Sequence, residues 1–416
     1  MMRILMFGWE YPPHITGGLG TACYWLANAL TEKGIKIDFL TPHQDDVKNP
    51  VGSCSDAKQA ASLKNEMENL GEVLSKFLHK ISIPSLLSPY PGNPVSSQPE
   101  KQSEHAIDDA LRKELARFDK ATVKALKGRN YDLIHAHDWP TYGAALMMRS
   151  ASNKPLILHV HSTEIDRNGE SGNQFIFKLE KKGFKKADKI IAVSHYTKNV
   201  LVSHYEVNPE KIEVVYHGVP PGFDHPETTD NLPGFREKVI TFCGRITRQK
   251  GPSHFIHAAS KLAERSDQIR FIMAGDGDLR DEMIELTAGL GISKRFHFPG
   301  FLNKEELKRL WKISDVLVMP SVSEPFGLTG IEAMSADLPV IVSRQSGLPE
   351  LFPHILQVDY WETDALADLI FDVITNTKLT LRQKQENRNR LAGLSWTTAA
   401  GQVADLYTTL SPNSIQ

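Results

Sequence analysis

Short runs of apolar residues alternate with longer segments of helical periodicity along most of the chain. Six runs in the first half predict β-strands, at residues 3–9, 36–42, 132–137, 155–162, 189–194 and 211–218. Five runs in the second half predict a further set, at residues 238–245, 269–275, 295–300, 315–321 and 338–343. Strands that are apolar along their whole length and separated by helices are typical of parallel sheets covered on both faces. The sequence therefore predicts an α/β protein with two doubly wound parallel sheets.

The composition changes between the two sets of strands. Residues 218–235 are rich in Pro, Gly and Asp, which indicates a linker between an N-terminal domain at 1–217 and a C-terminal domain at 218–394. Residues 44–102 are polar and rich in Ser, Pro and Lys, apart from a helical island at 63–78. We interpret this segment as an insertion at the edge of the first sheet.

The C-terminal tail predicts two helical pieces that are broken at residues 393–395. Ser395 is the expected N-cap of the second piece, because a serine side chain accepts a hydrogen bond from the leading N–H groups of a helix. The last helix is therefore expected at about 395–411.

Length, charge and cysteine content exclude several classes of protein. A chain of 416 residues is too long for one ordinary core and fits two domains. The net charge of −2 gives no global field that would attract nucleic acid or an anionic membrane. Cys23, Cys54 and Cys243 form no CxxC pair, so neither a disulfide framework nor a zinc ribbon is indicated. No apolar run reaches the roughly 18–20 residues of a membrane span and no cleavable signal opens the chain, so we expect a cytoplasmic protein.

The clearest chemistry lies at the carboxyl end of the strand at 238–245. Arg245 follows Gly244 there, and Lys250 comes five residues later. Open α/β sheets bind ligands in the crevice outside the carboxyl ends of their strands. A forked guanidinium and a compact ammonium in this crevice would recognise and neutralise a diphosphate. The alternative interpretation is that both are solvated loop charges. Gly275, which ends the next predicted strand, is a further expected substrate contact.

Two glutamates frame a turn after the strand at 315–321. A helix is expected to follow, and its unsatisfied leading donors, which make a ready anion site, would be the N–H groups of Gly327, Leu328 and Thr329. Glu324 lies in the preceding turn, where its carboxylate would accept two sugar hydroxyl protons. Glu332, about one turn into the helix, would point back toward the same crevice and grip the hydroxyl pair of a ribose. The alternative is that both acids merely cap a positive helix end.

The first strand is followed by the glycine-rich segment GWEYPPHITGGLG. Gly17, Gly18 and Gly20 would let the backbone approach a phosphate or a sugar, with a helix starting near Leu19. The spacing is GGxG rather than GxGxxG, and only Asp38, inside the second strand, offers an acid. These features argue against a dinucleotide fingerprint.

Two strand ends carry pairs of histidines. His135 and His137 share one face of their strand, and His159 and His161 share one face of theirs, because side chains alternate along a strand. The pairs need not converge and no further ligand completes a site, so no metal is expected. We interpret His161 and Asp138, each at the carboxyl end of a strand, as facing the crevice and binding sugar hydroxyls.

Residues 177–189 predict a basic amphipathic helix. The favoured interpretation is a solvated face, and association with a membrane surface or a polyanion is the alternative.

The motifs GGLG, HDW, HxHS, GRxxxxKG and EPFGLxxxE, in this order, resemble the retaining glycosyltransferases of the GT4 family, which have the GT-B fold. The resemblance covers nearly the whole chain except 44–102, and the HDW and GWEYPPHITGGLG segments look most like glycogen and starch synthases. It implies two Rossmann-like domains that face each other across a cleft, with the donor held by the C-terminal domain. It also implies that the helix at 395–411 returns to pack on the first domain, and that no metal cofactor is required.

The resemblance implies a role for each candidate residue. Arg245 and Lys250 match the pair that binds the donor diphosphate, Glu332 and Glu324 match ligands of the ribose and the hexose, and His161 and Asp138 match residues beside the reacting sugar. The expected catalytic residues are His161, Arg245, Lys250, Glu324 and Asp138. The expected substrate-binding residues are Gly17, Gly18, Gly275, Phe326, Gly327, Leu328, Thr329 and Glu332.

Two positions depart from the pattern of glycogen synthases. Thr16 stands where a lysine commonly precedes the Gly-Gly pair, which leaves the choice between ADP and UDP open. His217–Gly218 stands where the family frequently has Asn-Gly.

The implied reaction is front-face transfer of a hexosyl group, glucosyl in the leading hypothesis, from ADP- or UDP-glucose to an α-glucan with retention. The rival within the class is a lipid-linked, small-molecule or exopolysaccharide acceptor. Outside the class, a nucleotide-sugar epimerase or oxidoreductase is allowed by the fold alone, and a silent glucan-binding relative is a third alternative.

Overall fold

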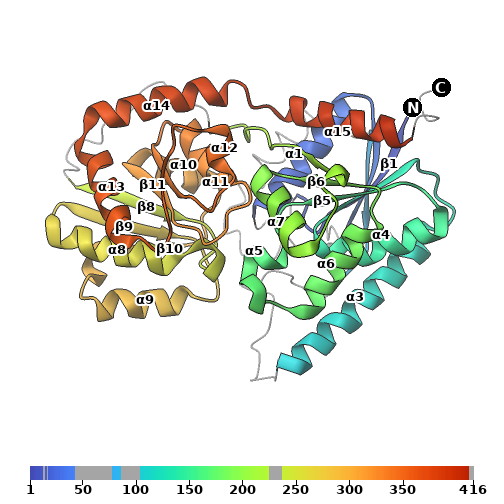
Figure 1. Ribbon diagram of the computed structural model, residues 1–416, viewed down its shortest axis with the longest axis horizontal. Helices are drawn as coiled ribbons and strands as arrows, with labels where there is room; N and C mark the ends of the chain where they lie inside the picture. The colour runs from blue at the N-terminus through green and yellow to red at the C-terminus, as the bar shows by residue number, and fades with distance from the viewer. Residues whose placement is uncertain (13–14, 16, 43–76, 86–103, 224–236, 412–416) are drawn as a thin grey trace.

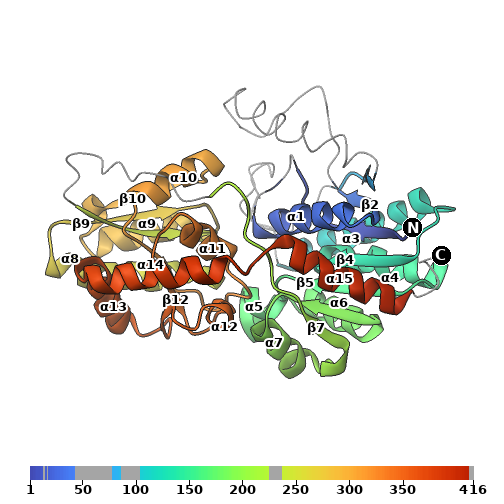
Figure 2. The same cartoon turned by 90° about the horizontal axis from the view of Figure 1, so that it is seen from above.

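The chain folds into two α/β lobes that lie side by side (Figure 1). The computed structural model describes residues 1–12, 15, 17–42, 77–85, 104–223 and 237–411. Each lobe is built on its own sheet, and the last two helices run from the second lobe back onto the first (Figure 2). The prediction of two parallel-sheet α/β units is confirmed.

The first sheet has seven strands in the order β3-β2-β1-β4-β5-β6-β7, and all neighbouring strands are parallel. Its strands are β1 (Arg3–Phe7), β2 (Lys36–Thr41), β3 (Leu78–Ser82), β4 (Leu133–His137), β5 (Leu156–Val160), β6 (Lys189–Ala192) and β7 (Ile212–Val214). Its helices are α1 (Gly18–Glu32), α3 (Glu104–Leu126), α4 (Trp139–Ser152), α5 (Glu164–Asn168), α6 (Gln174–Lys186) and α7 (His195–Tyr205). The strand order reverses between β1 and β4, so the loops after these two strands open a crevice at the carboxyl edge.

The second sheet has six parallel strands in the order β10-β9-β8-β11-β12-β13. Its strands are β8 (Lys238–Cys243), β9 (Ile269–Ala274), β10 (Phe296–Gly300), β11 (Val316–Met319), β12 (Val340–Ser343) and β13 (Leu356–Val358). Its helices are α8 (Pro252–Arg265), α9 (Arg280–Gly289), α10 (Lys304–Ile313), α11 (Leu328–Ser335), α12 (Leu348–Leu351), α13 (Thr363–Thr375) and α14 (Thr377–Leu391). Here the order reverses between β8 and β11, whose loops carry the predicted donor site.

Two edge strands were not predicted from the sequence. β3 lies within the predicted insertion at 44–102 and pairs with β2, while the three-residue β13 pairs with β12. Edge strands are short and covered on fewer sides, so their apolar pattern is weak. The rest of that insertion, with nearly all of the helical island at 63–78, lies outside the described residues, as do Thr16, Cys54 and residues 224–235 of the linker.

The last helix, α15 (Trp396–Leu410), belongs to the core of the first lobe. Trp396, Val403 and Tyr407 are buried there among the side chains of the first sheet. Its N-cap is Ser395, whose hydroxyl oxygen accepts a hydrogen bond from the Thr398 N–H at 3.0 Å. The chain therefore crosses between the lobes once after β7 and again before α15 (Figure 2).

The predicted basic helix is α6, and its apolar side is used inside the first lobe. Ile176 and Phe184 are buried, while Lys178, Lys182 and Lys185 face solvent. The helix therefore has a solvated basic face and keeps its apolar face for packing. Among the helices that the structure describes, none is both long and apolar enough to cross a membrane.

The cap of α15 gives a test of how the last helix is held. Replacing the cap hydroxyl in Ser395→Ala leaves an N–H of the first turn unpaired, which costs about 1 kcal/mol, whereas Ser395→Gly costs only a few tenths. Urea unfolding followed by tryptophan fluorescence measures both losses. Ser203→Ala, which removes an exposed hydroxyl within α7, is the matched control and should change stability by less than about 0.5 kcal/mol. Equal losses in the alanine and glycine variants would contradict the capping role.

A candidate active site between the two lobes

Two helix N-termini meet in the gap between the lobes. α1 of the first lobe starts at Gly18, with Gly17 as its N-cap, and α11 of the second starts at Leu328, with Gly327 as its N-cap. A Cβ placed on Gly18 would lie 3.5 Å from Leu328 Cδ1, so the two first turns are close neighbours. Both helix starts carry partial positive charge, which makes the space between them suited to an anion.

Gly327 is required by the geometry at the start of α11. Its φ of 97° lies in the left-handed region, and a Cβ there would meet Leu348 Cδ1 at 2.8 Å. The Gly330 N–H donates a hydrogen bond to the Gly327 carbonyl oxygen at 3.0 Å. The N–H groups of Leu328 and Thr329 precede it and are the leading donors of the helix, in the positions expected from the sequence.

The predicted diphosphate lysine and the predicted sugar acid lie together. Lys250 Nζ is 2.7 Å from Glu324 Oε2 and 2.9 Å from Oε1, and the Ser321 hydroxyl donates to Glu324 Oε2 at 3.0 Å. The Glu324 side chain is almost fully buried. Arg245 follows Gly244 at the end of β8, and its guanidinium donates to Gln249 Oε1 at 3.4 Å. The structure thus gathers these charges at one end of the second sheet.

The ends of β8 and β9 lie in close contact. Gly275 has φ of 131°, and a Cβ there would lie only 1.8 Å from the Gly244 carbonyl oxygen. Only glycine allows this approach, so Gly275 lets the end of β9 lie directly against the residue that precedes Arg245. Its role as a substrate contact stays a prediction.

Glu332 lies one turn into α11 and faces the end of β8. Burial raises the pKa of the Cys243 thiol at the end of β8, and the charge of Glu332 raises it further, so the two groups are neighbours. Burial raises the pKa of Glu332 itself to about 7, although the positive charge of Lys304 lowers it. A carboxyl group with such a pKa changes its protonation state near neutral pH. The ionised form only accepts hydrogen bonds, whereas the protonated form also carries one O–H donor.

Asp138 holds the backbone of the histidine that follows β5. It is the N-cap of α4 with φ of 55°, its side chain is buried, and its Oδ1 accepts the His161 N–H at 2.7 Å. Burial raises the pKa of Asp138 to about 7. The structure therefore brings Asp138 and His161 together as predicted, through a hydrogen bond from the His161 backbone to the Asp138 carboxylate. Direct binding of a sugar hydroxyl by Asp138 stays a prediction.

Five buried or half-buried imidazoles form a column through the first lobe. The His135 and His137 ring centroids are 4.4 Å apart, those of His159 and His161 are also 4.4 Å apart, and His217 stacks on His161 at 5.2 Å. Burial lowers the pKa of all five, to about 3 for His135 and for His217. The rings are therefore neutral at physiological pH.

The column reaches from the last helix to Phe326 of the second lobe. At one end the Tyr407 hydroxyl is hydrogen-bonded to His135 Nδ1 at 2.5 Å. At the other end His217 stacks on Trp396 at 5.3 Å and meets the edge of the buried Phe326 ring at 4.7 Å. Phe326 thus contributes its ring to the wall between the lobes.

The two histidine pairs converge, which the sequence had not indicated. β4 and β5 are neighbours, and their register places His137 directly opposite His159. Ring nitrogens of His135, His137 and His159 lie within 4.8 Å of one another, and so do ligand atoms of Cys23, His137 and His161. The rings are stacked nearly parallel, whereas imidazoles that share a metal radiate from it. The prediction that no metal is bound therefore stays a prediction.

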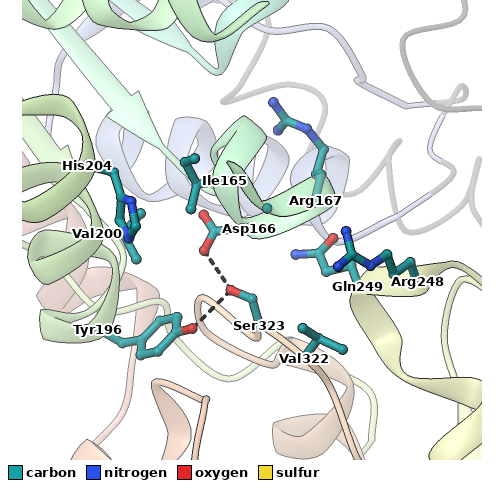
Figure 3. Close-up of a pocket in the computed structure, with 11 residues that line it drawn as sticks. Ile165, Asp166, Arg167, Tyr196, Val200, His204, Arg248, Gln249, Val322 and Ser323 are labelled. Carbon is teal, nitrogen blue, oxygen red and sulfur yellow. Dashed lines mark hydrogen bonds between the residues drawn. The ribbon is translucent and has the colours of Figure 1, made fainter. Parts of the chain in front are cut away.

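Direct hydrogen bonds join the lobes beside this site, and none of them was predicted from the sequence. Figure 3 shows a pocket lined from both lobes, in which Ser323 donates to Asp166 Oδ1 at 2.6 Å and Tyr196 donates to Ser323 at 3.1 Å. Arg248 donates to the Asn168 carbonyl oxygen at 2.7 Å across the same seam. These partners are more than 75 residues apart in the chain, so no local pattern reveals them.

Two family models match the chain. The model described as Glycosyl transferases group 1 matches residues 229–390, and the one described as Glycosyltransferase Family 4 matches residues 85–223. An uncharacterized glycosyltransferase of Methanocaldococcus jannaschii is 32% identical over 365 residues, which cover 85% of this chain and 83% of the relative. A D-inositol 3-phosphate glycosyltransferase of Corynebacterium efficiens is 27% identical, covering 72% of this chain and 76% of that protein. The glycogen synthase of Mycobacterium tuberculosis is 25% identical, covering 98% and 94%.

Solved structures share the fold over the whole chain. The sucrose-phosphate synthase of Thermosynechococcus elongatus superposes with a TM-score of 0.76 at 22% identity, and each chain is covered completely. HepE of Anabaena, solved in complex with UDP-glucose, gives a TM-score of 0.70 at 17% identity, with coverage of 98% and 100%. At these identities the likeness concerns the fold, and the predicted GT-B fold is confirmed.

The histidine column predicts a pH-dependent stability. An imidazole with a native pKa of about 3 titrates near 6.5 when unfolded, so the unfolded chain binds more protons between these values and stability falls as pH falls below about 6.5. Asp138 and Glu332, whose pKa values are raised, change stability with pH in the opposite sense. Both acids are present in the wild type and in a histidine variant, so the difference in stability between the two proteins reports the histidine. Relative to the wild type, His217→Phe should gain about 2 kcal/mol of unfolding free energy between pH 6.5 and pH 5.

Urea titrations at both pH values measure this difference. His297→Phe replaces an exposed imidazole of β10 and is the matched control, for which the difference should not change with pH. A His217→Phe variant whose stability relative to the wild type is the same at both pH values would contradict the assignment of a buried neutral ring.

Proposed function

The chain belongs to the glycosyltransferases, and we propose that it transfers a glucosyl group from ADP- or UDP-glucose to an α-glucan with retention of configuration. The observation that carries the proposal is the meeting of two positive helix starts, at Gly18 and Leu328, beside the ion pair of Lys250 with Glu324. A nucleotide diphosphate sugar presents in one molecule a dianion for the helix starts and hydroxyl groups for the carboxylate.

The diphosphate is proposed to lie between the two helix starts. The Leu328 and Thr329 N–H groups would donate to its oxygens, with Arg245 and Lys250 neutralising its charge. Because these donors are fixed before the reaction, they stabilise the negative charge that develops as the leaving group departs. UDP-glucose is bound by the structurally similar HepE, which supports a nucleotide sugar as the donor.

The sugars are proposed to be gripped by the acids around this point. Glu324 would accept hydroxyl protons of the hexose, and Glu332 those of the ribose. His161, held through its backbone by Asp138, would line the reacting carbon. These side chains come from both sheets, so the complete donor site requires both lobes.

The reaction is proposed to proceed on one face of the sugar. The bond from the anomeric carbon to the phosphate oxygen breaks, and its electron pair leaves with the diphosphate. The acceptor hydroxyl forms the new bond to that carbon, and its proton passes to the departing phosphate oxygen. The carboxylates of Glu324 and Asp138 are both engaged in hydrogen bonds within the protein, which supports a route without a covalent sugar–enzyme ester.

An α-glucan is the proposed acceptor, on the strength of the similarity to glycogen synthase over 98% of the chain. A small polyol or phosphorylated acceptor is the rival, since inositol phosphate glycosyltransferases are comparably similar, one of them over 94% of the chain. Incubation with ADP-glucose or UDP-glucose, with and without glycogen, distinguishes them when the released nucleoside diphosphate is measured. We expect release that depends on glycogen. No release with either donor would contradict the donor assignment, and release that glycogen does not increase would contradict the acceptor.

The two cations are expected to act on the transition state. Arg245→Ala and Lys250→Ala should each lower kcat/KM on the order of a hundredfold or more, because each removes a fixed donor from the developing charge. Steady-state kinetics with the preferred donor measure the loss. Lys294→Ala removes an exposed cation that precedes the edge strand β10, at the amino ends of the strands, and should leave kcat/KM unchanged. Rates near the wild type in both test variants would refute the diphosphate role.

Transfer is expected to be independent of divalent cations, because the proposed site neutralises the diphosphate with protein groups. Activity should be the same before and after dialysis against EDTA. A loss of activity that one divalent ion restores would contradict this and would direct attention to the converged histidines His135, His137 and His159.

A further inference from the structure

The carboxylate of Glu350 bridges the two lobes at the start of a helix. Glu350 lies in α12 of the second lobe, and its two oxygens accept the first two N–H groups of α7 in the first lobe. The His195 N–H donates to Oε2 at 2.8 Å and the Tyr196 N–H donates to Oε1 at 2.6 Å. The Tyr216 hydroxyl, in the connection after β7, donates to Oε2 at 3.0 Å. One side chain thus receives three hydrogen bonds from outside its own lobe.

This contact completes the cap of α7. The side chain of the local N-cap, Ser194, accepts the Thr197 N–H at 3.0 Å. The two preceding N–H groups have Glu350 as their acceptor, and the helix start carries partial positive charge. A carboxylate that accepts N–H groups at such a place makes charge-assisted hydrogen bonds, which are stronger than neutral ones. Closing the lobes therefore satisfies donors of α7 that its own chain segment leaves open.

Glu350 is also tied to the proposed donor site. The Glu324 N–H donates to the Gln345 carbonyl oxygen at 2.8 Å, and the Gly347 N–H donates to the Glu324 carbonyl oxygen at 2.9 Å. The backbone that leads into α12 is therefore bonded directly to the residue that pairs with Lys250. Next to it, the Ser194 hydroxyl donates to the Pro325 carbonyl oxygen at 2.6 Å. A shift of α12 away from α7 would move the Glu324 turn as well.

The backbone of the two lobes is closely packed where Gly347 meets Ser194. A Cβ on Gly347 would lie 2.4 Å from the Pro325 carbonyl oxygen and 2.8 Å from Ser194 Cβ. The backbone of the second lobe therefore approaches the start of α7 directly, and the seam cannot tilt freely while Glu350 stays bonded.

We propose that Glu350 is a positioning residue that holds the two lobes closed over the donor, and so directs the sugar to the acceptor rather than to water. The proposal rests on the proposed function for its chemical readout. When water replaces the acceptor, its oxygen bonds to the anomeric carbon, and the products are free glucose and the nucleoside diphosphate. Loosening the seam admits water to the gap, so hydrolysis should increase relative to transfer.

The test compares Glu350→Gln with Glu350→Asp and two controls. Glutamine keeps one acceptor oxygen but removes the charge and turns an NH₂ group toward one of the two N–H donors. Aspartate keeps the carboxylate on a shorter stem and should recover part of the effect. Tyr216→Phe removes only the tyrosine bond to Glu350 and should have a small effect. Glu305→Gln neutralises an exposed acid of α10 that is paired with Lys308 and should have none.

Two readouts are measured on the folded full chain, with folding checked by circular dichroism. The first is the ratio of glucose incorporated into glycogen to free glucose released, which we expect to fall about tenfold in Glu350→Gln, as loss of a charge-assisted bond implies. The second is the radius of gyration from X-ray scattering without substrate, which we expect to increase in Glu350→Gln and to stay unchanged in Glu305→Gln. An unchanged product ratio together with an unchanged radius in Glu350→Gln would overturn the proposal.

The scattering readout separates this proposal from the proposed function. If the wild type turns over neither donor, the proposed function fails, and an enlarged Glu350→Gln molecule would still support the closing role. If the wild type transfers glucose normally but Glu350→Gln retains its product ratio and its radius, only the closing role fails. Should Glu350→Gln not fold, the Glu350→Asp variant and the same two readouts decide the outcome.

Discussion

Both sheets of this molecule present the carboxyl ends of their parallel strands to the same gap, and the candidate site depends on that constraint. Parallel strands start their helices at one edge only, so the positive ends of α1 and α11 are brought to the gap by chain direction alone. The side chains that follow β4, β5, β8 and β11 arrive there for the same reason. Residues that are far apart in the sequence are thereby assembled at one site.

Charge is distributed unevenly around the gap. The second lobe supplies Arg245, Lys250 and Glu324 within a few residues of its strand ends, while the first lobe supplies the neutral histidine column. Burial keeps these imidazoles uncharged, so the first lobe adds a polar but uncharged wall close to the proposed anion site. In the proposed function, the second lobe supplies the charges that neutralise the diphosphate, and the sugar lies between the two lobes.

Much of the fold and of this site follows from local sequence, and the failures have a common physical cause. Continuous apolar strands, the Ser395 cap, and the glycines and acids around Gly327 were predictable because each is set by neighbours within a few residues. β3 and β13 were missed because edge strands need little apolar surface. The convergence of His137 with His159 depends on the register of two strands, and the Glu350 contact depends on how two lobes meet. Neither is determined by residues that lie close together in the sequence.

The place of α15 has a consequence for synthesis of the protein. Trp396, Val403 and Tyr407 fill the core of the lobe that is translated first, and the Tyr407 hydroxyl bonds to His135, some 270 positions earlier. That lobe leaves the ribosome without these core side chains, which are added only after the whole second lobe has been made. Folding of the two halves therefore finishes in the reverse of their order of translation, and the nascent first half must be shielded from aggregation until the final helix docks.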